Sequence, residues 1–79
     1  MNATDLSRVR WRCRRGMLEN DLILARFLDA RGSTMTSDEL IALNALLDLA
    51  DNDLWDLIAG RTESQDANVR PLLAALRVA

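Results

Sequence analysis

The sequence contains no histidine and no lysine, and it has a single cysteine among its 79 residues. Nucleophilic catalysis of the usual kind needs a serine, cysteine or threonine beside a base, which is most often histidine. Zinc sites likewise rely mostly on histidine and cysteine side chains. The missing histidine therefore argues against both kinds of site. Cys13 cannot form an internal disulfide, and we interpret it as a structural thiol.

Glycine and long apolar runs are also scarce. Gly16, Gly32 and Gly60 stand far apart, so neither a G-x-G-x-x-G segment nor a P-loop can be drawn through them. We therefore expect no nucleotide binding through these motifs. No apolar run follows a basic start as in a signal peptide, and none approaches the length of about 18 residues that a membrane span needs. We expect a soluble, cytoplasmic protein that does not contact a membrane.

β-Branched and aromatic residues are few, whereas leucine and alanine dominate the apolar half of the composition. This balance favours helices packed on one another. A chain of this length forms one domain and buries only about 60% of the surface that its unfolded chain exposes, so its core is small. We predict an all-α fold in which residues 1–79 form one small five-helix bundle, a single helical domain.

Start and stop signals predict where the helices lie. Thr36 and Glu39 have the spacing of a capping box, which is the clearest start signal in the chain. Gly16 and Gly60 suit the left-handed conformation that closes a helix. Apolar residues cover several sides of the second helix, so we expect it at the centre of the bundle. Together the signals predict helices at about 4–15, 17–30, 36–50, 54–59 and 69–78.

Charge is divided unevenly along the chain. Residues 1–15 carry five arginines against Asp5, whereas residues 16–66 carry three arginines against eleven acidic residues. Arginines on one helix can contact phosphates. However, the acidic remainder would repel a polyanion, and no second basic segment completes a footprint. We therefore expect these arginines to approach an acidic or partly buried site on another protein rather than nucleic acid.

Acidic residues occur in close pairs, which could in principle supply a general acid and a general base. The pairs Asp38/Glu39 and Asp51/Asp53 fall at predicted helix starts. Capping accounts for carboxylates at such positions without any acid–base chemistry. We therefore do not expect an enzyme.

The segment Arg15-Gly16-x-x-Glu19 allows two interpretations. In the first, Arg15 and Glu19 bridge a tight corner between the first two helices and only hold them in place. In the second, the corner protrudes and presents both side chains, with Gly16 bare so that a partner can come close. Spacing alone does not decide between them. Asp21 nearby needs a partner or water, and an upstream arginine is the candidate.

The wider segment around this corner resembles the signature of a known family. Trp11-x-Cys13-Arg14-Arg15-Gly16-Met17-x-Glu19-x-Asp21 looks like the R-G-x-x-E segment of the succinate dehydrogenase FAD assembly factors, the SdhE (YgfY, CptB-like) family. The likeness covers nearly the whole chain. It continues at Phe27, the helix start Thr36 to Leu40, Leu46-Leu47 and Asp51-x-Asp53-Leu54.

The resemblance implies a function. Family members are small five-helix proteins that bind the flavoprotein subunit of succinate dehydrogenase, and in some bacteria that of fumarate reductase. They promote covalent attachment of FAD to a histidine of that subunit. We expect this chain to bind no cofactor or metal itself, to be a monomer and to act on the FAD of its partner. A regulatory module of the antitoxin or nucleic-acid-binding kind is the alternative. By position, the resemblance implies that the partner-binding residues are Arg15, Gly16 and Glu19, flanked by Arg8, Trp11, Arg14, Met17 and Asp21.

Overall fold

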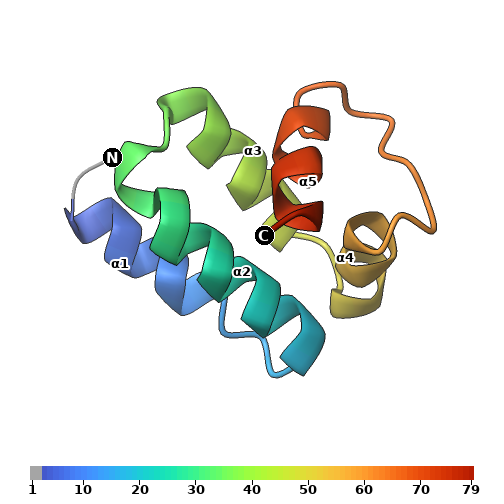
Figure 1. Ribbon diagram of the computed structural model, residues 1–79, viewed down its shortest axis with the longest axis horizontal. Coiled ribbons are helices and arrows are strands. Elements are labelled where there is room, and N and C mark those ends of the chain that lie inside the picture. The colour runs from blue at the N-terminus through green and yellow to red at the C-terminus, as the bar shows by residue number, and fades with distance from the viewer. Residues whose placement is uncertain (1–2) are drawn as a thin grey trace.

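The computed structural model of the chain describes residues 3–79 (Figure 1). Within these residues the prediction of an all-α fold with five helices is confirmed, and no strand is present. A single-turn 3₁₀ helix, η1 (Gly32–Thr34), follows the second helix. The five helices are α1 (Ala3–Arg12), α2 (Leu18–Arg31), α3 (Ser37–Leu47), α4 (Asp51–Ile58) and α5 (Arg70–Arg77).

The longest helix, α2, packs against several other elements. It packs against α4, α5 and η1. Helix α1, which precedes it, lies beside it in the opposite direction, and a tight corner joins the two helices (Figure 1). Helix α5 also packs on α3 and α4 and so closes the core from the C-terminal side. The second helix is therefore contacted by several elements, but it leaves a side with Leu18 and Leu22 exposed and does not lie inside the bundle as expected. The apolar residues buried in this core are Val9, Cys13, Leu24, Phe27, Leu28, Met35, Ala42, Leu43, Leu46, Leu47, Leu54, Ile58, Val69, Leu72, Leu73 and Leu76.

Two helix ends have the local structures that the sequence predicts. At the start of α3, the Thr36 hydroxyl accepts a hydrogen bond from the Glu39 amide and the Glu39 carboxylate accepts one from the Thr36 amide, which completes the capping box. At the end of α4, Gly60 has φ +79° and donates to the Leu57 carbonyl, while the Arg61 amide donates to the Asp56 carbonyl. This is the Schellman pattern, which satisfies carbonyls left free at a helix end.

Other helix boundaries differ from the prediction. The first helix ends at Arg12 and not at residue 15, so Arg14 and Arg15 lie outside it and share no helical face with Arg8. The third helix ends at Leu47, and the fourth begins at Asp51 rather than at residue 54. Acidic residues in a first turn interact favourably with the helix dipole, which explains why the run at 51–53 opens α4 instead of preceding it.

Candidate functional site

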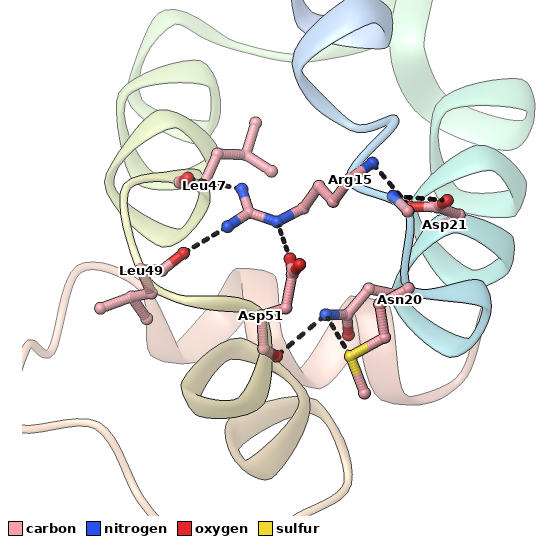
Figure 2. Close-up of polar contacts among 8 residues, drawn as sticks. Arg15, Asn20, Asp21, Leu47, Leu49 and Asp51 are labelled. Carbon is pink, nitrogen blue, oxygen red and sulfur yellow. Dashed lines mark hydrogen bonds and ion pairs between the residues drawn. The ribbon is translucent and has the colours of Figure 1, made fainter.

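The corner between α1 and α2, which comprises residues 13–21, owes its backbone shape to Asp21. One carboxylate oxygen of Asp21 accepts a hydrogen bond from the Arg15 amide at 2.9 Å, and the other accepts one from the Gly16 amide at 3.2 Å (Figure 2). These two amides are therefore used by Asp21 and do not continue α1. The expected partner of Asp21, an arginine side chain, is corrected: backbone amides hold this carboxylate.

The Arg15 side chain points away from solvent, toward the link between α3 and α4 (Figure 2). Its Nε donates to the carboxylate of Asp51, one terminal nitrogen donates to the Leu47 carbonyl at 2.6 Å, and the other donates to the Leu49 carbonyl. Only 15% of the side chain is exposed. The suggested bridge between Arg15 and Glu19 does not form, because Asp51 is the acidic partner of Arg15.

Asn20 lies beneath the corner and is fully buried. Its Nδ2 donates to the backbone carbonyl of Asp51 at 3.1 Å and lies 3.5 Å from the sulfur of Met17 (Figure 2). Its Oδ1 is buried without a hydrogen-bond donor among residues 3–79. Sequence reasoning missed both Asn20 and Asp51. The signal for either residue was weak at the level of sequence. Asn20 is an amide side chain among the apolar positions of α2, and Asp51 is an acidic residue 36 positions after Arg15.

The outer side of the corner is open. Gly16 has φ +87°, and a Cβ built there would meet no atom within 4 Å. Glu19 is exposed and has no hydrogen-bond or ion-pair partner in the described part of the chain, and the same holds for Arg8 and Arg14. Trp11 is 73% exposed. The structure therefore leaves five of the eight predicted site residues on the surface, and it places Arg15, Met17 and Asp21 half-buried behind them.

Apolar side chains extend this open surface along α2. Leu18 is 67% exposed and Leu22 is 47% exposed, four residues farther along the same helix face. Leu18 lies within the corner, and Leu22 follows it directly. An exposed tryptophan and two exposed leucines beside unpaired charged groups give the corner a mixed apolar and charged surface, which is the composition of protein-binding sites.

Several N-terminal arginines are already paired within the fold. Arg10 forms an ion pair with Asp29 at 2.9 Å, and Arg12 forms one with Asp48 at 2.7 Å. Together with the pair between Arg15 and Asp51, these contacts neutralise three of the five N-terminal arginines. The positive charge that remains for an external partner is therefore that of Arg8 and Arg14.

Cys13 is buried in the core at the start of the corner. Burial raises the pKa of its thiol from 9.0 to about 11, and this outweighs the opposite effect of the nearby Arg15, Arg10 and Arg12 guanidinium groups. A thiol with so high a pKa is almost entirely protonated at neutral pH and is a poor nucleophile. This environment agrees with the prediction of a structural thiol.

The raised pKa of Cys13 predicts a pH-dependent stability. Because the chain lacks lysine and tyrosine, Cys13 is the only side chain whose ordinary pKa lies between about 8 and 12. The folded state keeps the proton up to about pH 11, whereas the unfolded chain loses it near pH 9. Stability is therefore expected to fall between these values, by about 2–3 kcal/mol.

Urea unfolding at a series of pH values from 8 to 11 measures this decline. The variant Cys13→Ala is the control, because it has no side chain that ionises in this interval and its unfolding free energy should stay nearly constant. A wild-type profile as flat as that of Cys13→Ala would contradict the assigned pKa.

The fold and the corner together define a class of protein. None of the helices in residues 3–79 has the length and apolar character to cross a membrane. Nowhere in that range do three or more histidine, cysteine or acidic side chains come together as a metal site would require. The most distinctive surface is the open corner, whose backbone amides at Arg15 and Gly16 are bound by the Asp21 carboxylate. The class is therefore a small helical protein with a surface suited to contact another macromolecule.

The chain belongs to the family described as the flavinator of succinate dehydrogenase, whose model matches residues 7–79. Curated relatives carry the name FAD assembly factor SdhE. The relative from Ralstonia nicotianae is 44% identical over an alignment of 75 positions, and this alignment covers 90% of this chain and 79% of that protein. The relative from Methylococcus capsulatus is 39% identical over 70 residues, covering 89% and 84%, and that from Coxiella burnetii is 33% identical over 70 residues, covering 89% and 85%. No solved structure matches the chain significantly.

Proposed function

We propose that this protein is an FAD assembly factor that binds the flavoprotein subunit of succinate dehydrogenase, or of fumarate reductase, and promotes covalent attachment of FAD. Family membership and the names of the relatives support this proposal. The observation that carries it is the open corner at Gly16, where the backbone is bare on its outer side and Glu19 is exposed and has no partner among residues 3–79. The relatives named above are bacterial, and in this proposal the site of action is the cytoplasm.

In this proposal the chain binds no cofactor itself and acts on the FAD of its partner. The absence of histidine means that it cannot carry flavin through a histidyl link, so the linked side chain must belong to the client. The helper is not an enzyme and donates no reactive group. It holds the client in the arrangement in which its histidine meets the flavin, and correct positioning of two reactants can lower a barrier by several kcal/mol.

The proposed docking surface is the outer side of the corner. Gly16 allows close approach of the client's backbone, since no side chain stands in the way. Glu19 and Arg14 offer unpaired charges, and Trp11 offers a large apolar area of the kind that dominates protein interfaces. Arg8 is exposed on α1, five residues before the corner begins, whereas Arg15, Met17 and Asp21 are half-buried within the corner.

Nucleic acid is a poorer candidate partner. Binding to phosphates depends on several free cationic groups that act together. Here Arg10, Arg12 and Arg15 are paired with aspartates. We therefore favour a protein client. In this proposal the chain acts as a monomer.

The test uses purified flavoprotein subunits of succinate dehydrogenase and fumarate reductase, FAD and the wild-type chain. Covalent flavin is measured as in-gel fluorescence after denaturation. We expect the chain to accelerate the appearance of fluorescence on at least one client, and we expect no fluorescence on the chain itself. Equal rates with and without the chain on both clients would refute the proposal. A gel shift that weakens steeply with salt would support the nucleic-acid alternative.

A further inference from the structure

One residue outside the R-G-x-x-E segment fixes both arms of the corner. The side chain of Asp51 accepts a hydrogen bond from Arg15 Nε, before the turn, and its backbone carbonyl accepts one from Asn20 Nδ2, in the first turn of α2 (Figure 2). Asp51 is itself the first residue of α4. The corner is therefore attached through one residue to a helix that follows it by more than thirty positions.

The attachment through Arg15 depends on the fixed orientation of its guanidinium group. The guanidinium is a planar fork, and here its other two nitrogens donate to the carbonyls of Leu47, the last residue of α3, and Leu49, in the link to α4. A cation at the end of α3 and a carboxylate at the start of α4 also agree with the two helix dipoles. All three nitrogens of the Arg15 guanidinium thus donate a hydrogen bond within the fold.

The attachment through Asn20 lowers stability in one respect, which suggests that this residue serves to position α2. Asn20 is fully buried, and its Oδ1 has no donor within residues 3–79. An unsatisfied buried oxygen is destabilising, so the amide is a poor choice for stability alone. What it does provide is the hydrogen bond to Asp51, which fixes where α2 begins relative to α4.

We propose that Asp51 and Arg15 are positioning residues, which hold Gly16 and Glu19 in the arrangement that docks, and that neither contacts the client directly. The proposal rests on the assembly-factor function given above. It assigns a part in that function to Asp51, which lies on a different helix from the corner. It also divides the R-G-x-x-E segment into an arginine that faces the fold and a glycine and glutamate that face the client.

The test compares Asp51→Asn with Asp53→Asn. Both remove one carboxylate from the first turn of α4, but Asp53 is exposed and has no partner within the described residues. The first readout, on the free chain, is hydrogen exchange of the Arg15 and Gly16 amides by NMR. The second is the concentration of chain that gives half of the maximal rate of flavin attachment. We expect Asp51→Asn to speed the exchange and to raise this concentration, each by about tenfold, as for loss of a charge-assisted hydrogen bond at a partly exposed site.

The maximal rate should change little, because at saturating concentrations of the chain the bound client itself holds the corner in place. Asp53→Asn should stay within twofold of wild type in both readouts. Arg15→Lys keeps the charge but loses the forked guanidinium, so it should resemble Asp51→Asn in both readouts. The double variant should show no larger change than the more impaired of the two single variants, because both substitutions break the same contact. Asp51→Glu keeps a carboxylate near Arg15 and should recover most of the loss. It also provides the comparison if Asp51→Asn does not fold, which circular dichroism reports.

Equal behaviour of Asp51→Asn and Asp53→Asn in both readouts would overturn the proposal. So would additive losses in the double variant together with a much larger loss for Arg15→Lys, since Arg15 would then contact the client. If the wild-type chain does not promote flavin attachment at all, the assembly-factor function fails. The exchange readout still decides whether Asp51 fixes the corner, so the two failures can be told apart.

Discussion

Gly16→Arg is expected to abolish promotion of flavin attachment while the helical bundle stays folded. A Cβ at this position meets no atom within 4 Å, so the new side chain fits the free protein and projects outward from the corner. It would then occupy the space that the client's backbone needs. We expect a loss of roughly 100-fold or more in the rate at limiting chain concentration, as for removal of an interface hot spot. The measurement is in-gel flavin fluorescence over time.

Gly60→Arg is the matched control. Gly60 also has a left-handed φ, of +79°, and a Cβ there also meets open space, but it lies at the far end of α4 from Asp51. Each variant forces arginine into a left-handed conformation, which costs about 1–2 kcal/mol. Both should therefore lose similar stability, and only Gly16→Arg should lose activity. Similar activity in the two variants, or loss of the helical circular dichroism in Gly16→Arg alone, would contradict an interaction surface at Gly16.

Phe27→Ala is expected to have the largest effect on stability. Phe27 is 2% exposed at the centre of α2, and its ring also lies 5.4 Å from the Arg31 guanidinium carbon. Truncation of a buried phenylalanine costs about 3–5 kcal/mol. A domain of 79 residues has a total stability of about 4–12 kcal/mol, so this variant should be close to unfolding at 37 °C.

Leu22→Ala is the control for Phe27→Ala, because Leu22 is on the same helix and is 47% exposed. Its unfolding free energy should fall by less than about 1 kcal/mol, as for most substitutions outside the core. Urea unfolding followed by circular dichroism measures both variants. Equal losses of unfolding free energy in the two variants would mean that the side of α2 that carries Phe27 does not pack into the core.

The parts of the fold that depend on local partners were predictable. The capping box at Thr36 and Glu39 joins residues three apart, and the glycine closure at Gly60 joins residues within one helical turn. Such signals need no knowledge of the tertiary structure. The end of α1 was not predictable in this way, because the amides of residues 15 and 16 leave the helix for a carboxylate six and five residues ahead.

The candidate site was predicted only in outline. The residues around Gly16 were identified, but the direction of the Arg15 side chain depends on Asp51, 36 residues away, and on carbonyls of the link between α3 and α4. Periodicity also failed on α2. Its apolar residues cover too many sides to define one inner face, and the buried position next to α4 is taken by Asn20 while Leu18 is left exposed. Only the packing of the whole chain settles these points.

The most direct test of the central claim is the footprint of the client on the chain. In an NMR titration of ¹⁵N-labelled chain with the unlabelled flavoprotein subunit, we expect the signals of Gly16, Glu19, Arg14 and the Trp11 indole to be lost or shifted first. Signals of surface residues outside the corner, such as the exposed Ile41 on α3 and Asp66 before α5, should change last. Early changes at Ile41 and Asp66, with the signals of the corner left unchanged, would contradict docking through the corner.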